Sequence, residues 1–402
     1  MKHVILIIMD GLGDRPNVEL DGKTALQAAT KPNLDYLSSH GTTGLMSPVS
    51  FGIRAGSDTS HLSILGYDPH KYYTGRGPFE ALGLGIPLKP GDIAFRANYA
   101  SVMNGKIIDR RAGRIQNTED LSRELETEID GVKFIVKSGV EHRAAVVIRG
   151  SGLSDMISDT DPHSVNSQPV NAKALSPEAD FTASLINKFL ERSRKILAKH
   201  PLNQKLVSQG KLPANEIMLR GAGKIPKLPS FHEKYGMNGA CISGTPLIRG
   251  IAGLAGFDII SVEGMNGRVD TNYSNIISAA IRSLEKYDFI LINIKGTDIA
   301  GHDKKPLLKK EVIEKVDSVI LPLLKLLPDT LIVVTGDHST PCSFGDHTGD
   351  PVPILFATDG IINDNVKTFD ELSVSTGYYK ITSNDIMPLI MSYSDRSEKY
   401  GA

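Results

Sequence analysis

The sequence predicts an α/β protein in which helices flank a mostly parallel sheet and a smaller α+β domain is inserted. Short apolar runs rich in β-branched residues end in polar residues or glycine, which is typical of strands buried on both faces. Helical patterns lie between these runs, and such alternation favours a parallel sheet with right-handed crossovers. The strand candidates are residues 4–9, 289–294, 331–334 and 352–356, and the helical patterns are residues 275–286 and 312–327.

The middle of the chain predicts the inserted domain, because short strand candidates precede one long amphipathic helix at residues 181–199. Segments rich in glycine and proline around 83–92 and 221–230 flank this region, as expected of crossings between domains. The strand candidates are residues 93–99, 134–136 and 144–148. The expected division is a discontinuous larger domain, 1–88 and 230–402, and an inserted domain, 89–229.

Composition excludes several kinds of partner. The 402 residues include 45 basic and 46 acidic side chains. The net charge is therefore close to zero and does not indicate binding to nucleic acid or to an anionic membrane. Cys241 and Cys342 lack metal-ligand spacing and predict no disulfide framework, which fits a reducing cytoplasm. No uncharged run approaches the ~18 residues of a membrane-spanning helix, and Asp10 interrupts the apolar start too early for a signal peptide. We expect a cytoplasmic protein that acts on a small molecule, in an oligomeric state that the sequence does not define.

Acidic residues and histidines follow three of the predicted strands. In a parallel sheet the carboxyl ends of the strands share one edge, and reactive groups collect there. We therefore expect Asp10, the segment 295–302 and the pair Asp337–His338 to converge.

Two segments carry candidate metal ligands. In TDIAGHD, Asp298 and His302 are four residues apart, so a helical turn would place carboxylate and imidazole on one face. In VVTGDHSTPCSFGDHTGD, Asp337 and His338 follow a strand, and His347 lies nine residues later in a glycine-rich loop. This combination of an acid and two histidines suits a catalytic metal with open coordination positions. The alternatives are a helix cap beside a solvated histidine in the first segment and ordinary loop polarity in the second.

Asp10 and Ser57 are the candidates near the beginning of the chain. A carboxylate buried at the end of the first strand needs a compensating positive charge, which a metal would supply; the alternative is that Asp10 caps an Asp-Gly turn. Ser57 precedes a helical pattern whose free N–H groups can hold a phosphate, while a metal activates the hydroxyl as a nucleophile. The alternative is that Ser57 or Asp58 serves only as the helix N-cap.

Together these segments resemble the alkaline phosphatase superfamily and, within it, the archaeal branch of the cofactor-independent phosphoglycerate mutases. The bacterial members carry GNSEVGHLNI around the nucleophile, and GSDTSHLSIL aligns with it so that Ser57 takes the nucleophile's place and His61 and Leu62 match. This alignment selects Ser57 over Thr59 and Ser60. YTGRGPFEALGLGIP, FRANYASV and SDTDPHS are similar to archaeal-branch segments, and the resemblance covers nearly the whole chain.

The resemblance implies an alkaline-phosphatase-like catalytic domain that binds two divalent metal ions. Mn²⁺ is the first expectation, and Zn²⁺, Co²⁺ or Mg²⁺ also suit a mixed set of oxygen and nitrogen ligands. Ser57 is the implied catalytic nucleophile. The implied ligands are Asp298, His302 and His347 for one ion, and Asp10, Ser57, Asp337 and His338 for the other.

The implied reaction is the interconversion of 3-phosphoglycerate and 2-phosphoglycerate in glycolysis and gluconeogenesis, through a phosphoserine and without 2,3-bisphosphoglycerate. The inserted domain would bind substrate and act as a lid that excludes water from the phosphoenzyme. One alternative keeps the site but makes the chain a metal-dependent phosphomonoesterase or another sugar-phosphate mutase. The other is a non-catalytic protein stabilised by metals, against which the Ser57 hydroxyl argues because a structural site has little use for it.

Substrate-binding candidates lie in and next to the inserted domain, whose divergence from the bacterial pattern prevents a match of the bacterial arginines. They are Arg143 in EHRAAVVIRG, Asp161 in SDTDPHS and Arg220 in MLRGAG. Arginine can bind a carboxylate or phosphate with two hydrogen bonds, and aspartate can accept one from a glycerate hydroxyl. The alternatives are an Arg143–Glu141 pair and a turn that Asp161 initiates. A second candidate for an anion site is the basic cluster Arg110, Arg111 and Arg114, and the alternative is that these arginines are solvated on the surface.

Overall fold

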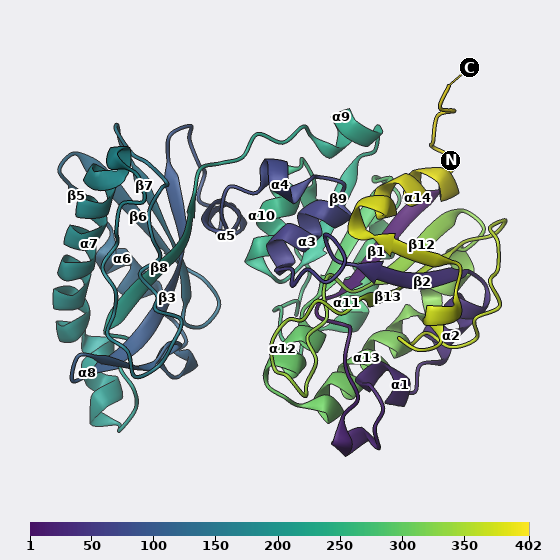
Figure 1. The fold of residues 1–402 in the computed structure, drawn as a ribbon, viewed down its shortest axis with the longest axis horizontal. Helices are drawn as coiled ribbons and strands as arrows, with labels where there is room; N and C mark the ends of the chain where they lie inside the picture. The colour runs from purple at the N-terminus through teal and green to yellow at the C-terminus, as the bar shows by residue number, and fades with distance from the viewer. Residues whose placement is uncertain (402) are drawn as a thin grey trace. The chain divides into compact units, whose positions relative to one another are not determined.

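The computed structural model describes residues 1–401, and the chain forms two compact units (Figure 1). The larger unit comprises Met1–Tyr72 and Leu228–Ala402, and the smaller unit comprises Tyr73–Lys227. The smaller unit begins upstream of the glycine- and proline-rich segment because the helix α5 (Gly77–Gly83) packs against the sheet of this unit. Ala81 of α5 belongs to the same apolar cluster as Ala94 and Val147 of that sheet.

The larger unit is built around an eight-stranded sheet. Its spatial order is β10 (Asp258–Ile259), β9 (Gly239–Ser243), β11 (Phe289–Ile294), β1 (His3–Met9), β12 (Thr330–Thr335), β13 (Val352–Ala357), β2 (Thr42–Ser47) and β14 (Tyr379–Thr382). The four predicted strands are present as β1, β11, β12 and β13, and nearly all of their residues are buried. Only β13 runs against the common direction. The expectation of a mostly parallel sheet is thus confirmed.

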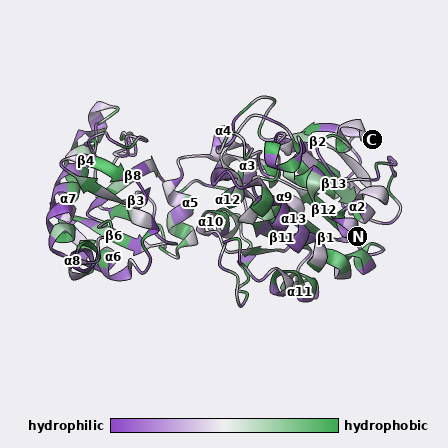
Figure 2. Cartoon of the chain, turned by 90° about the horizontal axis from the view of Figure 1, so that it is seen from below, coloured by the Kyte–Doolittle hydropathy of each residue, from purple (hydrophilic) through white to green (hydrophobic). Residues whose placement is uncertain are grey.

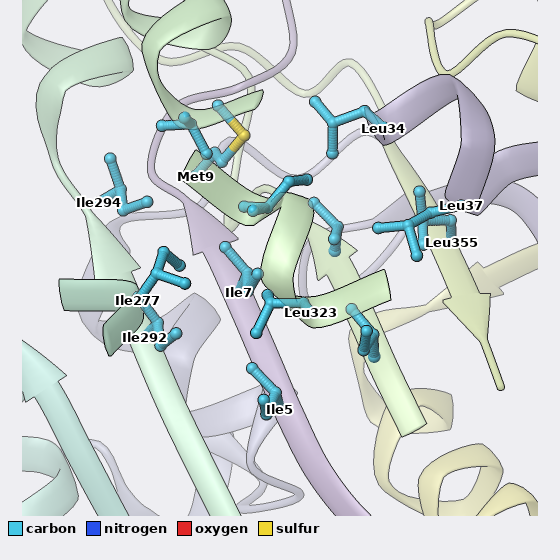
Figure 3. Close-up of a cluster of buried hydrophobic side chains, with 14 of the residues drawn as sticks. Ile5, Ile7, Met9, Leu34, Leu37, Ile277, Ile292, Ile294, Leu323 and Leu355 are labelled. Atoms are coloured by element: carbon cyan, nitrogen blue, oxygen red, sulfur yellow. The ribbon is translucent and has the colours of Figure 1, made fainter. Parts of the chain in front are cut away.

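One face of this sheet packs against helices through alternate residues of the central strands. Ile5, Ile7 and Met9 of β1 lie beside Ile292 and Ile294 of β11 (Figure 3). Each such side chain stabilises the fold by about 1.5–3 kcal/mol when it is fully buried. Apolar residues of α2 (Pro32–Ser39), α11 (Tyr273–Ser283), α13 (Pro306–Ile320) and the 3₁₀ helix η4 (Leu321–Leu326) complete the cluster. The last three elements correspond to the two predicted helical patterns.

The carboxyl edge of the sheet collects the segments that were expected to converge. β1, β11 and β12 are neighbours and parallel, and Met9 pairs with Ile294. Because β13 runs the other way, the loop before its first residue, Val352, lies at this same edge. Met46 near the end of β2 pairs with Val352, so β2 ends at this same edge. The loop that follows β2 and the helix α3 (Ser57–Ile64) therefore begin there as well.

The smaller unit has a six-stranded antiparallel sheet in the order β4, β3, β7, β6, β5, with β8 paired to β3. The strands are β3 (Ile93–Met103), β4 (Lys106–Asp109), β5 (Thr127–Ile129), β6 (Val132–Ser138), β7 (Arg143–Arg149) and β8 (Glu216–Gly223). The predicted long helix is α7 (Asp180–Lys199), whose Phe189 ring stacks on Phe134 of β6 with centroids 4.6 Å apart. The strands of both units are rich in hydrophobic residues (Figure 2).

The other α-helices are all shorter than α7, α11 and α13. They are α1 (Ala25–Ala28), α4 (Pro69–Tyr72), α6 (Glu119–Leu125), α8 (Pro201–Ser208), α9 (Phe231–Tyr235), α10 (Pro246–Leu254), α12 (Gly296–His302) and α14 (Ile386–Tyr393). Among residues 1–401, no helix combines the length and the apolar character needed to cross a membrane.

Candidate metal centre and anion site

Asp10 directly follows β1 and is completely buried at the carboxyl edge of the larger sheet. Lys295 Nζ donates to its Oδ1 at 2.7 Å, and Asn293 Nδ2 donates to its Oδ2 at 3.1 Å. Burial by itself would raise the pKa of Asp10, but the Lys295 ammonium holds this pKa below its usual value. Asp10 therefore presents a buried, ionised carboxylate, which is a strong ligand for a divalent cation.

Asp337 and His338 follow β12 and are also completely buried. Asp337 Oδ1 accepts hydrogen bonds from the backbone N–H groups of Gly11 and His338, at 2.9 and 3.0 Å. Asp337 Oδ2 has no hydrogen-bond partner within residues 1–401. Burial and the neighbouring Asp10 charge raise the pKa of Asp337 to about 6. A buried carboxylate oxygen without a donor costs free energy that a bound cation would offset, so this oxygen fits a metal ligand.

Asp298 and His302 lie one turn apart on α12, as their spacing predicts. His302 Nε2 is 3.4 Å from Asp298 Oδ1, and His347 Nε2, in the loop before β13, is 3.6 Å from the same oxygen. Burial by itself would raise the pKa of Asp298, but Lys295 and His338 hold this pKa well below its usual value. A helix and a loop that are distant in the sequence thus bring two imidazoles to one carboxylate.

His302 and His347 are oriented through their Nδ1 atoms. His347 Nδ1 lies 2.8 Å from the carbonyl oxygen of Ala55, and His302 Nδ1 lies 3.1 Å from that of Gly345. A carbonyl can only accept, so each Nδ1 carries the proton and each Nε2 keeps a lone pair for a metal. Burial lowers the pKa of His338 and of His347 to about 4, so both rings are neutral at pH 7, as metal binding requires.

Ser57 is the first residue of α3, and the N-cap is Gly56, so the alternative of a Ser57 or Asp58 N-cap is wrong. Ser57 Oγ is buried and lies 3.1 Å from His338 Nε2. The neighbouring hydroxyls are used elsewhere, since Thr59 donates to Gly56 O and Ser60 donates to Asp337 O. Of these three hydroxyls, Ser57 has the position of a nucleophile.

Two groups of possible metal ligands meet around His338. Asp10, Asp337 and His338 form one group, and Asp298, His338 and His347 form the other, with the ligand atoms of each group within 4.8 Å of one another. His302, Asp346 and His347 form a third, overlapping group. The structure therefore brings together all seven residues predicted for the metal centre. His338 lies in both main groups, whereas the resemblance assigns it only to the ion of Asp10.

Lys295 is a residue of this centre that the sequence prediction missed. Its ammonium lies 2.7 Å from Asp10 Oδ1 and 2.7 Å from Asp298 Oδ2, so it bridges the two ligand groups. Burial by itself would lower the pKa of Lys295, but the two carboxylates raise it above its usual value. The available signal was its place directly after the buried strand β11, at the edge where reactive groups collect.

A second polar cluster lies on one face of the smaller sheet. Arg96 of β3 pairs with Arg220 of β8, and Asn98 of β3 pairs with Arg143 of β7. Cross-strand partners and alternate residues share a face, so these four side chains share the face on which Ala94 packs with α5. Within residues 1–401, three buried atoms of this cluster have no hydrogen-bond partner: Arg96 Nε, Arg220 Nε and Asn98 Oδ1.

The cluster carries an excess of positive charge. Glu80 Oε1 accepts a hydrogen bond from Arg76 Nε at 2.9 Å and lies 3.7 Å from Arg96 Nε. Burial, followed by repulsion from Arg76 and Arg220, lowers the pKa of Arg96 well below its usual value. Guanidinium groups that outnumber the neighbouring carboxylates favour an anionic ligand. Arg96 was not predicted, although an arginine among the apolar residues of a strand is a usable signal.

The predicted substrate residues have different surroundings in the structure. Arg143 is exposed on the shared face, and Arg220 Nη1 lies 3.7 Å from the buried Asp161. Asp161 accepts two hydrogen bonds from Arg110, at 3.0 and 2.6 Å, and one from the His163 N–H, as its turn alternative predicts. The basic cluster is therefore divided, since Arg110 binds Asp161 while Arg111 and Arg114 are exposed.

The fold and the site together define a class of protein. A serine hydroxyl beside two groups of carboxylate and imidazole ligands, at the carboxyl edge of an α/β sheet, is the arrangement of metal-assisted phosphoryl transfer. Residues 38–203 match the family described as 2,3-bisphosphoglycerate-independent phosphoglycerate mutase.

Relatives with that description cover the whole chain. The protein with this name from Picrophilus torridus is 59% identical over 402 residues, which are 100% of both chains, and the one from Thermoplasma volcanium is 52% identical over 100% of this chain and 99% of its own. The solved cofactor-independent phosphoglycerate mutase from Thermoplasma acidophilum is 45% identical, with a TM-score of 0.70 over 98% of this chain and 100% of its own. A solved Pyrococcus horikoshii protein is 37% identical, with a TM-score of 0.87 over 100% of this chain and 99% of its own. The chain belongs to the family of 2,3-bisphosphoglycerate-independent phosphoglycerate mutases, and it is therefore an isomerase.

Proposed function

We propose that this chain interconverts 3-phosphoglycerate and 2-phosphoglycerate through a phosphoserine on Ser57, with two divalent metal ions, preferably Mn²⁺. The observation that carries the proposal is the Ser57 hydroxyl 3.1 Å from Nε2 of His338, the histidine that both ligand groups share. Divalent ions, when bound, neutralise the phosphoryl oxygens and lower the pKa of a hydroxyl. One ion would be held by Asp298, His302 and His347, and the other by Asp10, Ser57, Asp337 and His338.

The proposed reaction at Ser57 consists of two phosphoryl transfers. Ser57 Oγ forms a bond to phosphorus while the bond from phosphorus to the 3-oxygen of the substrate breaks; the serine loses its proton and the 3-oxygen gains one. The glycerate then reorients, and its 2-oxygen attacks the phosphoserine, loses its proton and releases Ser57 Oγ, which regains one. The phosphoryl group stays on the enzyme between the steps, so 2,3-bisphosphoglycerate is not needed.

Two features of the larger unit support a phosphoryl group at this position. Ser57 begins α3, and the first N–H groups of a helix have no partner within the helix and can bind phosphate oxygens; in α3 the Thr59 N–H already donates to Asp58 Oδ1. The Lys295 ammonium lies next to Asp10 and Asp298 and can neutralise charge on the transferred group.

The arginine cluster of the smaller unit supports an anionic substrate. We assign Arg143, Arg220 and the additional Arg96 to the anionic groups of phosphoglycerate, because two of these guanidinium groups have buried Nε atoms without partners within residues 1–401. Asp161 would accept a hydrogen bond from a glycerate hydroxyl while Arg110 orients its carboxylate.

The reaction is tested by incubating the purified chain with 3-phosphoglycerate and Mn²⁺ and following the products by phosphorus NMR. We expect 2-phosphoglycerate to form at a rate that EDTA abolishes and Mn²⁺ restores. Inorganic phosphate as the main product would make the chain a phosphomonoesterase. If neither product forms with any divalent ion, the chain is not a catalyst of this class.

Arg96→Met is expected to raise KM for phosphoglycerate by about 10² while the melting temperature stays the same or rises. The substitution removes a buried charge that only a bound anion satisfies fully, so it weakens binding without a loss of stability. Arg149→Met is the matched control, because Arg149 already has a carboxylate partner in the buried Asp92. It should lower the melting temperature and leave KM unchanged. An unchanged KM for Arg96→Met would remove Arg96 from the substrate site.

We also place the enzyme in the cytoplasm. Cys241 and Cys342 are buried free thiols, and burial raises the pKa of each to about 12, so both are unreactive. Such thiols fit a reducing compartment. The proposed small-molecule partner there is phosphoglycerate.

A further inference from the structure

Thr340 connects the two candidate ligand groups through one hydroxyl. The residue is completely buried, and its Oγ1 lies 2.8 Å from Asp298 Oδ1 and 3.1 Å from His338 Nδ1. Asp298 belongs to α12 and His338 follows β12, so the hydroxyl joins ligands from two separate segments. We propose that Thr340 is a positioning residue that orients ligands of both metal ions at once. This inference rests on the two-metal function proposed above.

The direction of the two hydrogen bonds follows from proton counting. A hydroxyl has one hydrogen, and the Asp298 carboxylate can only accept it. The Thr340 oxygen therefore accepts from Nδ1–H of His338, which leaves the lone pair of this imidazole on Nε2. Nε2 faces Ser57 Oγ at 3.1 Å and Asp337 Oδ2 at 3.3 Å. One hydroxyl thus selects the His338 tautomer that can act as a ligand at the centre.

Thr340 differs in this respect from the groups that orient the other two histidines. His302 and His347 donate from Nδ1 to backbone carbonyls, which every residue type possesses. His338, the histidine shared by both ligand groups, depends on a side-chain hydroxyl. A substitution at Thr340 can therefore affect the shared ligand without changing the backbone.

The backbone of Thr340 is held in place by a buried lysine. Thr340 N donates to Gly13 O at 3.1 Å, and Lys309 Nζ donates to both Gly13 O and Thr340 O at 3.0 Å. Lys309 is completely buried on α13, the helix that follows α12. A buried ammonium is costly unless it is hydrogen-bonded, so these contacts join the turns after β1 and β12 firmly.

Two glycines allow the ligand segments to approach Thr340 closely. A Cβ atom at Gly301 of α12 would lie 2.3 Å from Thr340 O. A Cβ at Gly11, which follows Asp10 and has φ +64°, would lie 2.6 Å from Thr340 Oγ1. Any side chain at either position would displace Thr340. The segment after Asp10, the helix α12 and the turn that carries His338 therefore all depend on the position of Thr340.

Thr340→Val keeps the shape of the side chain and removes the hydroxyl. We expect this variant to bind Mn²⁺ about 10–100-fold more weakly at both sites, as measured by the electron paramagnetic resonance signal of free Mn²⁺ in a titration of the full chain. Thr340→Ser should restore binding to near the parent affinity, because it retains the hydroxyl. The matched control is Thr358→Val, which removes a buried hydroxyl that donates to Leu327 O beyond the opposite edge of the sheet. It should bind Mn²⁺ like the parent.

Parent-like Mn²⁺ binding by Thr340→Val would overturn the proposal, and so would weakening at one site only, because the hydroxyl would then not serve both ions. A parent chain that binds no Mn²⁺ would instead refute the proposed two-metal function. A measurement on the unmodified chain covers the case in which the valine variant does not fold. The imidazole ¹⁵N spectrum of the metal-free parent, with His338 assigned through His338→Gln, should show the Nδ1–H tautomer. An Nε2–H tautomer would contradict the assignment.

Discussion

Ser57→Ala is expected to lower the mutase rate by at least about 10⁴-fold while the chain remains folded and still binds Mn²⁺. The reason is that in the proposed mechanism Ser57 Oγ forms the covalent bond to phosphorus, and the other hydroxyls of α3 are engaged elsewhere. The substitution removes one atom at the first position of a helix whose N-cap is Gly56, so the stability should change little. Asp298, His302 and His347 are all retained, so at least one ion should bind.

The measurement is the initial rate of 2-phosphoglycerate formation with saturating Mn²⁺, together with mass spectrometry of acid-quenched protein. The parent should show a phosphorylated peptide that contains Ser57, and the alanine variant should not. Ser63→Ala is a matched control on the same helix, because the Ser63 hydroxyl is buried but donates to Asn384 Oδ1 at 2.8 Å, away from the ligands. It should retain the parent rate. A Ser57→Ala rate within tenfold of the parent would exclude the covalent route.

Asp298→Asn is expected to remove one Mn²⁺ ion per chain and to lower kcat/KM by about 10³-fold. Asp298 Oδ1 is the atom near which His302 and His347 converge, at 3.4 and 3.6 Å. An amide of the same size keeps the packing but loses the negative charge that attracts the cation. It also removes one of the two carboxylates that hold Lys295, so the ammonium should be less well positioned.

The number of bound Mn²⁺ ions can be counted by equilibrium dialysis, in parallel with the kinetic assay. The matched control is Asp317→Asn on α13, because Asp317 is equally buried but accepts a hydrogen bond from the Leu34 N–H at 2.7 Å and belongs to none of the ligand groups. It should lower the melting temperature without changing the Mn²⁺ count. Two tightly bound ions in Asp298→Asn would remove this carboxylate from the ligand set.

Much of the fold could be predicted because its signals are local. The segment 289–294, apolar except for Asn293, is β11 without a change of boundary, since such a run is stable only between two covered faces. The spacing of Asp298 and His302 likewise predicts the turn of α12, because helical geometry relates residues four apart. The reversal of β13 had no comparable signal, because an isolated apolar strand does not indicate its direction.

The missed polar residues depend on contacts between distant segments. Lys295 matters because Asp10 and Asp298 lie on either side of its ammonium, and Asp10 is 285 positions away in the sequence. Arg96 matters because strand register places Arg220 beside it on the same face. An arginine within an apolar strand was a usable signal for Arg96, but a single sequence contains no record of register, so its pairing with Arg220 could not be predicted.

The order of amino acids alone predicted seven of the strands, three helical segments, the edge at which the reactive residues gather, and the resemblance that selects Ser57. Local periodicity and the geometry of parallel sheets are sufficient for those conclusions. Three features became visible only in the folded chain: Gly56 is the N-cap of α3, His338 is shared by two ligand groups, and Thr340 connects these groups. These features are hydrogen bonds and distances of a few ångströms between segments, and they arise only when the sheet register and helix packing place the side chains in contact.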